Sequence, residues 1–275
     1  MSAPAAMPGV PGSVAVTPPA TLLRFGAPAA PRRRLICLPF AGGGAAAYRP
    51  WTRALPADVE VLAAQLPGRE SRVRERPIDD IATMAAAVRP AVEAAAELPY
   101  AVFGHSMGAL VAFELTLALE AAADAGVIAR GPSHLFVSAR RAPDERDDYP
   151  PMDALADEAF LDEVQRRYGG VPAVVRQEPE LMALLLPALR ADIRALERYA
   201  PTAGRRVRCP VHVYGGTADR HPLPSQLAGW QRVAERAVRV RLFPGDHFYL
   251  AAERDALTAD IAAQWTDAAE PAASA

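Results

Sequence analysis

The fold of this chain is decided by residues 100–121, which read YAVFGHSMGALVAFELTLALEA. The stretch begins as a short apolar run, turns at a glycine, and continues as an apolar run of helical length. Gly104, Ser106 and Gly108 form a G-x-S-x-G pattern in the turn. Such a pattern occurs by chance, but between a strand and a helix it lifts a serine hydroxyl out of a sheet edge. We therefore expect an α/β protein in which Ser106 is a nucleophile.

Five further apolar runs surround this strand–turn–helix unit, each short and bounded by glycine or proline. They lie at residues 35–38, 59–64, 134–138, 211–214 and 238–243. Short apolar runs with such boundaries are typical of buried parallel strands. Helical patterns separate them, at residues 80–97, 227–237 and 254–265. The alternation predicts a mostly parallel central sheet with helices on both faces.

One region, residues 144–199, interrupts the alternation because it carries helical patterns and no strand signal. An insertion of this size is commonly a lid over the site of an α/β enzyme, although a packed helical layer is the alternative. The predicted core is therefore residues 31–143 and 200–266. Residues 1–30 and 267–275, rich in alanine and proline, are expected to be disordered tails.

Composition excludes several classes of protein. The chain has 275 residues, 51% of them hydrophobic, which is too apolar for a disordered chain. All 30 basic residues are arginine and the net charge is −2, so no basic excess indicates nucleic acid. No uncharged apolar stretch is long enough for a membrane span. Two cysteines, Cys37 and Cys209, exclude a disulfide framework and lead us to expect a reduced, cytoplasmic protein.

The base that must activate Ser106 is sought among five histidines. His247 lies in FPGDHF, residues 243–248, directly after the last predicted strand. An α/β-hydrolase places its base there, in the chain order Ser, Asp, His. His221, after the fifth predicted strand, is the second candidate. Structural roles are expected for the other three, His105, His134 and His212.

The carboxylate that orients this base is expected to be Asp219. It lies in YGGTAD, residues 214–219, in the loop that closes the fifth predicted strand. Its order and place favour an orienting role over the capping of a helix. Asp144, after the fourth strand, is the alternative. Asp246 is disfavoured because sequence neighbours such as His247 rarely face each other.

The oxyanion that forms during acyl transfer needs hydrogen-bond donors. The backbone N–H of Met107, at the start of the helix, points where that charge would form. The loop after the first predicted strand, PFAGGG at residues 39–44, is expected to supply a second donor. It matches neither glycine-rich phosphate-binding pattern. No H-E-x-x-H motif or cysteine pair predicts a metal site.

Five segments together resemble the type II thioesterases, the stand-alone editing hydrolases of polyketide and nonribosomal peptide synthesis. They are LPFAGGG (38–44), QLPGRE (65–70), FGHSMG (103–108), SARRAP (138–143) and GDHF (245–248). The resemblance runs from about residue 33 to residue 265, and the second and fourth segments are its most specific parts. The chain departs from it at Phe40, where relatives often carry histidine or tyrosine, and at Gly245-Asp246, where Gly-Gly is frequent.

The resemblance implies an α/β-hydrolase that cleaves acyl thioesters from the phosphopantetheine arm of a carrier protein, with no cofactor of its own. It implies Ser106, Asp219 and His247 as the catalytic residues and the N–H groups of Ala41 and Met107 as the oxyanion hole. Without the resemblance, the residues indicate only a serine hydrolase that acts on an acyl group. A carboxylesterase, an acyltransferase and a catalytically silent binding module remain alternatives. The initiating methionine and the tails lead us to expect a separate protein rather than a synthase domain.

The predicted lid carries a dense apolar stripe, from which Leu181, Leu185 and Leu189 are expected to line the acyl pocket. Packing onto the core is the alternative fate of such a stripe. Gly169-Gly170 and Pro187 are places where the lid helices are expected to break or bend. Three arginines beside the Pro-Gly turn are candidates for guiding an acidic carrier protein to the entrance, and an ordinary solvated face is the alternative for each of them: Arg69, Arg72 and Arg74.

Overall fold

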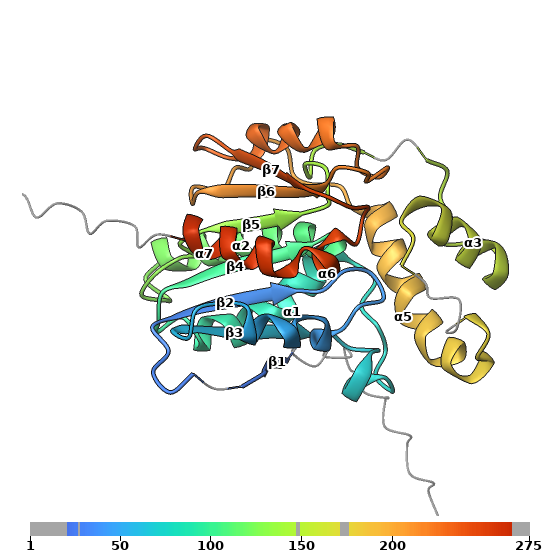
Figure 1. Cartoon of the computed structure of the whole chain (residues 1–275), viewed down its shortest axis with the longest axis horizontal. Coiled ribbons are helices and arrows are strands. Elements are labelled where there is room, and N and C mark those ends of the chain that lie inside the picture. Colours follow the sequence, from blue (N-terminus) through green and yellow to red (C-terminus); the bar gives the residue numbers. More distant parts are fainter. Residues whose placement is uncertain (1–20, 27, 147–148, 171–175, 266–275) are drawn as a thin grey trace, which may run out of the picture.

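A computed structural model of the chain describes residues 21–26, 28–146, 149–170 and 176–265. Its centre is a seven-stranded sheet in the order β1-β3-β2-β4-β5-β6-β7. All neighbouring strands are parallel except β1, which pairs antiparallel with β3. The strands are β1 (Thr21–Arg24), β2 (Arg33–Leu38), β3 (Val59–Gln65), β4 (Tyr100–His105), β5 (Leu135–Ser138), β6 (Val211–Gly216) and β7 (Arg239–Phe243). The predicted mostly parallel α/β sheet is confirmed (Figure 1).

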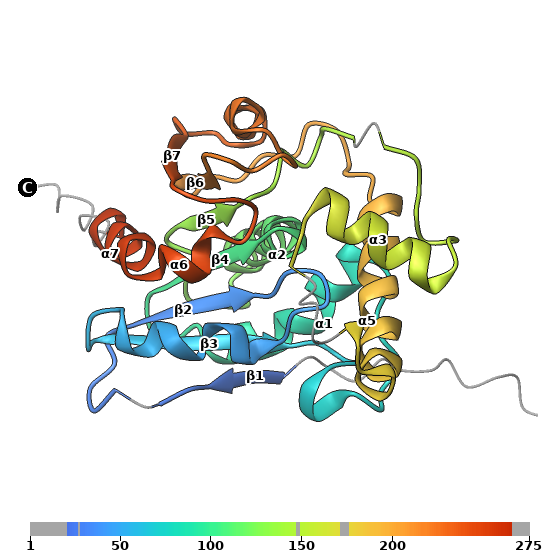
Figure 2. The same ribbon diagram turned by 45° about the vertical axis from the view of Figure 1, so that its right-hand side comes forward.

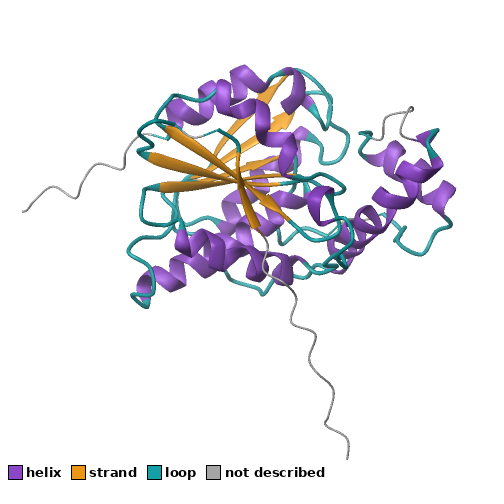
Figure 3. Cartoon of the chain, turned by 90° about the horizontal axis from the view of Figure 1, so that it is seen from below, coloured by secondary structure: helices purple, strands orange, loops and turns teal. Residues whose placement is uncertain are grey.

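Helices cover both faces of the sheet, as the sequence predicts (Figure 3). One apolar core lies under α1 (Ile81–Ala94), α2 (Met107–Asp124) and the 3₁₀ helix η3 (Pro224–Val233). The other lies under the 3₁₀ helix η1 (Ala45–Arg53), α6 (Tyr249–Ala252) and α7 (Arg254–Gln264). A short 3₁₀ turn, η2 (Glu70–Arg72), follows β3. Because β2 to β5 carry apolar side chains to both cores, nearly every residue of these strands is buried.

The sequence-based description needs two corrections at the edges of the sheet. Thr21–Arg24 form β1, so the predicted N-terminal tail is too long at its inner end; residues 1–20 lie outside the described residues. The run at 238–243 forms a strand, but Arg239–Leu242 are exposed rather than buried. Since β7 is the last strand of the sheet, only one of its edges is paired.

Residues 144–199, the helical insertion, contain α3 (Asp157–Arg167) and α5 (Pro179–Arg198). These two helices lie together at the end of the sheet to which β2 points (Figure 2). α5 continues through Pro187 without ending there, whereas Gly169 and Gly170 follow α3 with positive φ angles. In the part of the chain that the structure describes, no helix is both long and apolar enough to cross a bilayer.

Candidate active site

The turn between β4 and α2 holds Ser106 in a conformation that few non-glycine residues adopt, with φ 53° and ψ −116°. A side chain at Gly104 would overlap the backbone of Gly108, and one at Gly108 would overlap the backbone carbonyl of Leu38. The two glycines therefore let the helix start directly against β2 and β4. The result is the predicted sharp turn, with the serine at its apex.

Ser106, His247 and Asp219 form one hydrogen-bonded chain. His247 Nε2 lies 2.9 Å from Ser106 Oγ, and His247 Nδ1 lies 2.9 Å from Asp219 Oδ2. The three residues come from the ends of β4, β6 and β7, which meet at the carboxyl edge of the sheet. Each is at most 5% exposed. Asp219 is held in turn, because its other oxygen accepts the N–H of His221 at 2.9 Å.

The alternative acids and base lie elsewhere. Asp144 is at the surface, where both its oxygens accept hydrogen bonds from Arg232. Asp246 accepts the N–H of Phe248, two residues along. The ring of His221 packs edge-on against two tyrosines of the insertion, and the residue serves Asp219 through its backbone. Of the candidates, only Asp219 therefore reaches His247.

A second buried chain of polar groups lies behind the serine turn. Ser138 Oγ lies 2.9 Å from His105 Nδ1 and 2.7 Å from the hydroxyl of Tyr249. Burial and the nearby imidazole of His247 lower the pKa of His105 well below its usual value, and burial raises the pKa of Tyr249. Both groups are therefore neutral near pH 7. His105 directly precedes Ser106, and Tyr249 follows His247 by two residues. This chain of hydrogen bonds therefore links the segment that carries the serine to the segment that carries the base.

The remaining two histidines, His134 and His212, lie in contact with the ring of Phe136, with ring centroids 5.7 and 5.1 Å from it. Burial, together with the neighbouring His212 and Arg236, lowers the pKa of His134 to about 4. Burial also lowers the pKa of His212. Both histidines are therefore neutral near pH 7 and pack against Phe136, which fits the structural roles expected of them.

The two predicted oxyanion donors flank the serine. Ala41 lines the same cavity as Ser106, and Met107 is the first residue of α2. Among the described residues neither backbone N–H has a hydrogen-bond acceptor in the protein. The next N–H in the loop, that of Gly42, is engaged by Asp192 Oδ2 at 2.7 Å. The loop thus leaves Ala41 and not Gly42 available to a substrate.

A cavity of about 210 Å³ opens over Ser106 and His247. The sheet side of its wall is formed by loop residues and the insertion side by apolar side chains of α3 and α5. The insertion contributes Val164, Tyr168, Gly169, Gly170, Met182, Leu185, Leu189, Ile193 and Leu196. Leu185 and Leu189 therefore lie where the sequence predicts. Leu181 does not line the cavity and is 38% exposed; the neighbouring Met182 takes that place.

The prediction that Arg69 lies at the surface and guides a carrier protein is wrong. The Arg69 side chain is buried, and its guanidinium makes two hydrogen bonds of 2.9 Å to the two oxygens of Asp192. It is therefore no docking residue at the surface. Arg72 is bound to both oxygens of Glu75, and Arg74 is exposed.

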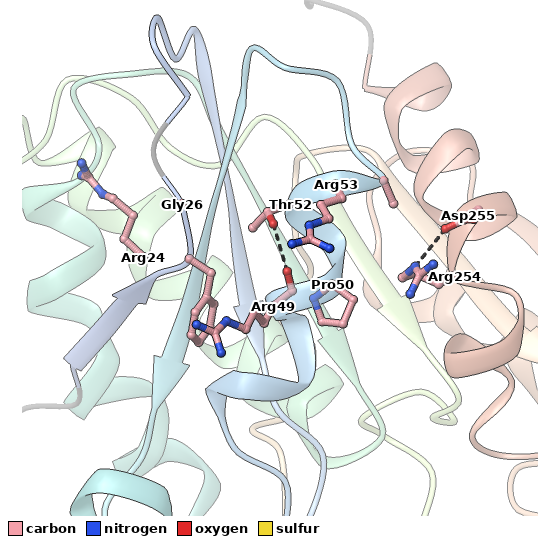
Figure 4. Close-up of a pocket in the computed structure, with 10 residues that line it drawn as sticks. Arg24, Gly26, Arg49, Pro50, Thr52, Arg53, Arg254 and Asp255 are labelled. Carbon is pink, nitrogen blue, oxygen red and sulfur yellow. Dashed lines mark hydrogen bonds and ion pairs between the residues drawn. The ribbon is translucent and has the colours of Figure 1, made fainter.

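A larger cavity, of about 970 Å³, lies away from Ser106 beside β1, η1 and the start of α7 (Figure 4). Its lining is rich in arginine: Arg24, Arg49, Arg53 and Arg254. Arg24 pairs with Glu60, and Arg254 pairs with Asp255. Its lining residues include no serine, cysteine or histidine. We therefore assign the active site to the smaller cavity, on chemistry rather than size.

The sequence analysis does not assign several residues to the site, and four of these make specific contacts there. Phe40 and Phe248 pack edge-to-face at 5.1 Å on one side of the cavity. Tyr168 of the insertion lies 5.4 Å from the ring of His247. Asp192 reaches the oxyanion loop from α5. The first two flank motif residues, so their position is a usable signal, whereas the last two lie in a region without any motif.

Comparisons with known proteins show the family and the fold to which the chain is similar. A family model described as "Thioesterase domain" matches residues 33–265. The gramicidin S biosynthesis protein GrsT of Aneurinibacillus migulanus is 37% identical over 224 residues, which are 80% of this chain and 84% of that protein. Thioesterase PikA5 of Streptomyces venezuelae is 38% identical over 218 residues, 79% of this chain and 75% of that protein. The solved structure of the type II thioesterase BorB, from the borrelidin biosynthetic cluster, has a TM-score of 0.76 at 35% identity and covers 88% of this chain and 96% of that one.

Proposed function

The chain belongs to the thioesterase family, and we propose that it hydrolyses acyl thioesters held on the phosphopantetheine arm of carrier proteins. Its relatives GrsT and BorB are named for gramicidin S biosynthesis and for the borrelidin cluster, which supports a role beside a polyketide or nonribosomal peptide synthase. The substrates would be wrong or stalled acyl groups. The observation that carries the proposal is the hydrogen-bonded chain of Ser106, His247 and Asp219 beneath an apolar cavity.

The first half-reaction acylates the enzyme. His247 Nε2, 2.9 Å from Ser106 Oγ, takes the hydroxyl proton while Oγ attacks the thioester carbonyl carbon. The carbonyl oxygen becomes an oxyanion, which accepts hydrogen bonds from the N–H groups of Ala41 and Met107. When the tetrahedral intermediate collapses, the carbon–sulfur bond breaks. The arm then leaves as a thiol with the proton from His247.

The second half-reaction releases the acid. A water molecule gives its proton to His247 as its oxygen attacks the acyl-Ser106 ester, and the oxyanion forms again in the same place. Collapse returns the proton to Ser106 Oγ and frees the carboxylic acid. Asp219 remains a carboxylate throughout and holds the imidazole in the required orientation. These steps use only protein groups and water, so we propose that the enzyme needs no metal or organic cofactor of its own.

The apolar walls of the cavity support an acyl group as the part of the substrate that is recognised. Side chains of α5 such as Leu185 and Leu189 would contact the acyl chain, while the thiol end of the arm reaches Ser106 and the carrier protein stays outside. Of the arginines predicted to guide an acidic carrier, only Arg74 is exposed and without a close acidic partner among the described residues. We propose Arg74 as a carrier contact, whose replacement by alanine would raise KM most at low salt. Free thiols at both cysteines support the expected cytoplasmic location.

The experiment that tests the function compares two substrates with the same acyl group. One is the acyl-loaded carrier protein, and the other is the nitrophenyl ester. A higher kcat/KM for the loaded carrier, with free acid as the product, is expected. Preference for the small ester would indicate a carboxylesterase, and transfer to an added acceptor in place of water would indicate an acyltransferase. Absence of turnover on both would indicate a binding module.

The nucleophile is tested in the same preparation with a fluorophosphonate. One adduct is expected, on the peptide that contains Ser106, and Ser106→Ala should abolish both labelling and hydrolysis. Labelling that persists in Ser106→Ala would place the nucleophile elsewhere.

A further inference from the structure

Helix α5 touches the oxyanion loop at two residues, one turn apart. Leu189 packs on Gly42 so closely that a Cβ at Gly42 would lie 3.1 Å from the leucine Cδ1. Asp192, three residues further, accepts the Gly42 N–H at 2.7 Å. The helix that walls the acyl cavity is therefore bonded directly to the loop beside Ala41.

Arg69 completes this contact from the other side. Its guanidinium binds both oxygens of Asp192 and also donates to the carbonyl of Gly43 at 3.1 Å. Gly43 N–H in turn donates to the carbonyl of Phe40 at 2.9 Å, which closes the turn. Four consecutive peptide groups, from Phe40–Ala41 to Gly43–Gly44, are thereby each held by a hydrogen bond.

The orientation of the Ala41 N–H follows from these bonds. It shares a peptide plane with the Phe40 carbonyl, and in a trans peptide the N–H points opposite to the C=O. The next plane carries the Gly42 N–H, which Asp192 holds. Because Gly42 has a φ of +73° and little steric restraint of its own, the loop relies on these external bonds to keep its shape.

The pair is held at an energetic cost. Asp192 is completely buried and Arg69 is 2% exposed, and removing both charges from water offsets much of their attraction. Burial raises the pKa of Asp192, in opposition to the guanidinium and the Gly42 N–H, which lower it. A buried pair of this kind contributes little net stability to the fold. We therefore expect the pair to matter for the geometry of the loop that it holds.

We propose that Asp192, held by Arg69, is a positioning residue that aims the Ala41 N–H at the oxyanion and links the wall of the acyl cavity to the catalytic loop. This inference rests on the proposed function. Asp192 does not touch the reacting atoms and acts only through Gly42. Its effect should appear in kcat and not in KM, because the oxyanion exists only in the transition state and the intermediates.

The first test is Asp192→Asn, which keeps the shape of the side chain and removes its charge. We expect kcat to fall by roughly 10²–10³, the range for loss of one oxyanion donor, with KM changed less than about threefold. The rate of Ser106 labelling by a fluorophosphonate should fall in parallel, since this reaction uses the same oxyanion hole. A matched control is Glu60→Gln, which removes the charge from a buried carboxylate paired with Arg34 at the opposite edge of the sheet. It should keep kcat and the labelling rate.

The second test is the double variant Arg69→Met with Asp192→Leu, which removes both charges and keeps the volume. Such replacements are often neutral or stabilising. The double variant should therefore fold even if Asp192→Asn, which leaves the charge of Arg69 unpaired, fails to fold. The proposal predicts a melting temperature close to that of the wild type together with the same loss of kcat and labelling rate. A folded double variant with wild-type kcat and labelling rate would overturn it. The labelling rate separates the two claims, because it reports the oxyanion hole even if the wild type hydrolyses no carrier-bound thioester.

Discussion

Gly104 and Gly108 face each other across the turn that carries Ser106, so closely that a side chain on Gly104 would overlap the carbonyl of Gly108. A side chain on Gly108 would likewise overlap the carbonyl of Leu38. The glycines of the G-x-S-x-G pattern are thus a steric requirement of the contact between β2, β4 and α2.

Gly104→Ala should therefore destabilise the protein by about 3 kcal/mol or more, since backbone atoms and not flexible side chains stand in the way. The matched control is Gly131→Ala, where the nearest atom to a new Cβ lies 3.6 Å away. It should change the free energy of unfolding by less than about 0.5 kcal/mol. Urea denaturation of the three proteins measures both effects. Equal stability of the two variants would contradict this account of the turn.

Asp219→Asn should lower kcat by about 10⁴, if the loss seen when a triad carboxylate is removed transfers here. The fold should persist, because the amide fills the same space. Asp144→Asn is the control, since Asp144 binds Arg232 at the surface, and its kcat should stay within a factor of about two. Steady-state hydrolysis and circular dichroism of both variants decide the matter. A severe loss in Asp144→Asn with a mild one in Asp219→Asn would refute the assignment.

Leu185→Trp should shorten the acyl chains that the enzyme accepts, because Leu185 lines the cavity over Ser106. Leu184→Trp on the same helix is the control, since Leu184 is 54% exposed and does not line the cavity. The measurement is kcat/KM for a series of acyl thioesters of increasing length. An unchanged chain-length preference in Leu185→Trp, together with lower stability, would show that the stripe only packs on the core.

His134→Gln should make the protein less sensitive to acid. The pKa of His134 is lowered to about 4 in the folded state, against about 6.5 in the unfolded chain. As the pH falls from 6.5 to 4, the unfolded chain takes up the proton first, so stability is lost over this window. Removing the imidazole should reduce the slope of the free energy of unfolding against pH in this window by at most about 1.4 kcal/mol per pH unit.

The measurement is the free energy of unfolding at several pH values between 7.5 and 4.5. The value at pH 7.5, where His134 is neutral in both states, isolates the packing effect of the substitution. A variant with the same acid slope as the wild type would show that His134 is not a source of the acid sensitivity.

The sequence predicts the six parallel strands because each is a short apolar run between glycines or prolines. It misses β1, since Thr21–Arg24 offer only two central apolar residues and owe their structure to pairing with the edge of β3. Of the three cavity residues that the sequence predicts on α5, Leu185 and Leu189 line the cavity and Leu181 does not. Leu181 and Met182 are equally apolar in the sequence, and only packing selects Met182 for the cavity.

The position of Asp192 could not be predicted for a different reason. An aspartate on an amphipathic helix ordinarily marks the solvated face, and an arginine after a Pro-Gly turn ordinarily lies at the surface. Arg69 and Asp192 are 123 residues apart, so no local pattern connects them. By contrast, Ser106, His247 and Asp219 each follow a strand, and the shared edge of a parallel sheet brings them together.

The helical insertion lies in a single excursion of the chain between β5 and β6. Recombination between related genes can therefore exchange residues 144–199 as one cassette and alter the range of acyl groups accepted while the sheet stays as it is. The bond between Asp192 and Gly42 sets a condition on such exchanges. An incoming cassette without a carboxylate at that place would leave Arg69 as a lone buried cation. Exchange of the insertion is thus constrained where its residues pack on the core, and also at the helical turn that carries Leu189 and Asp192.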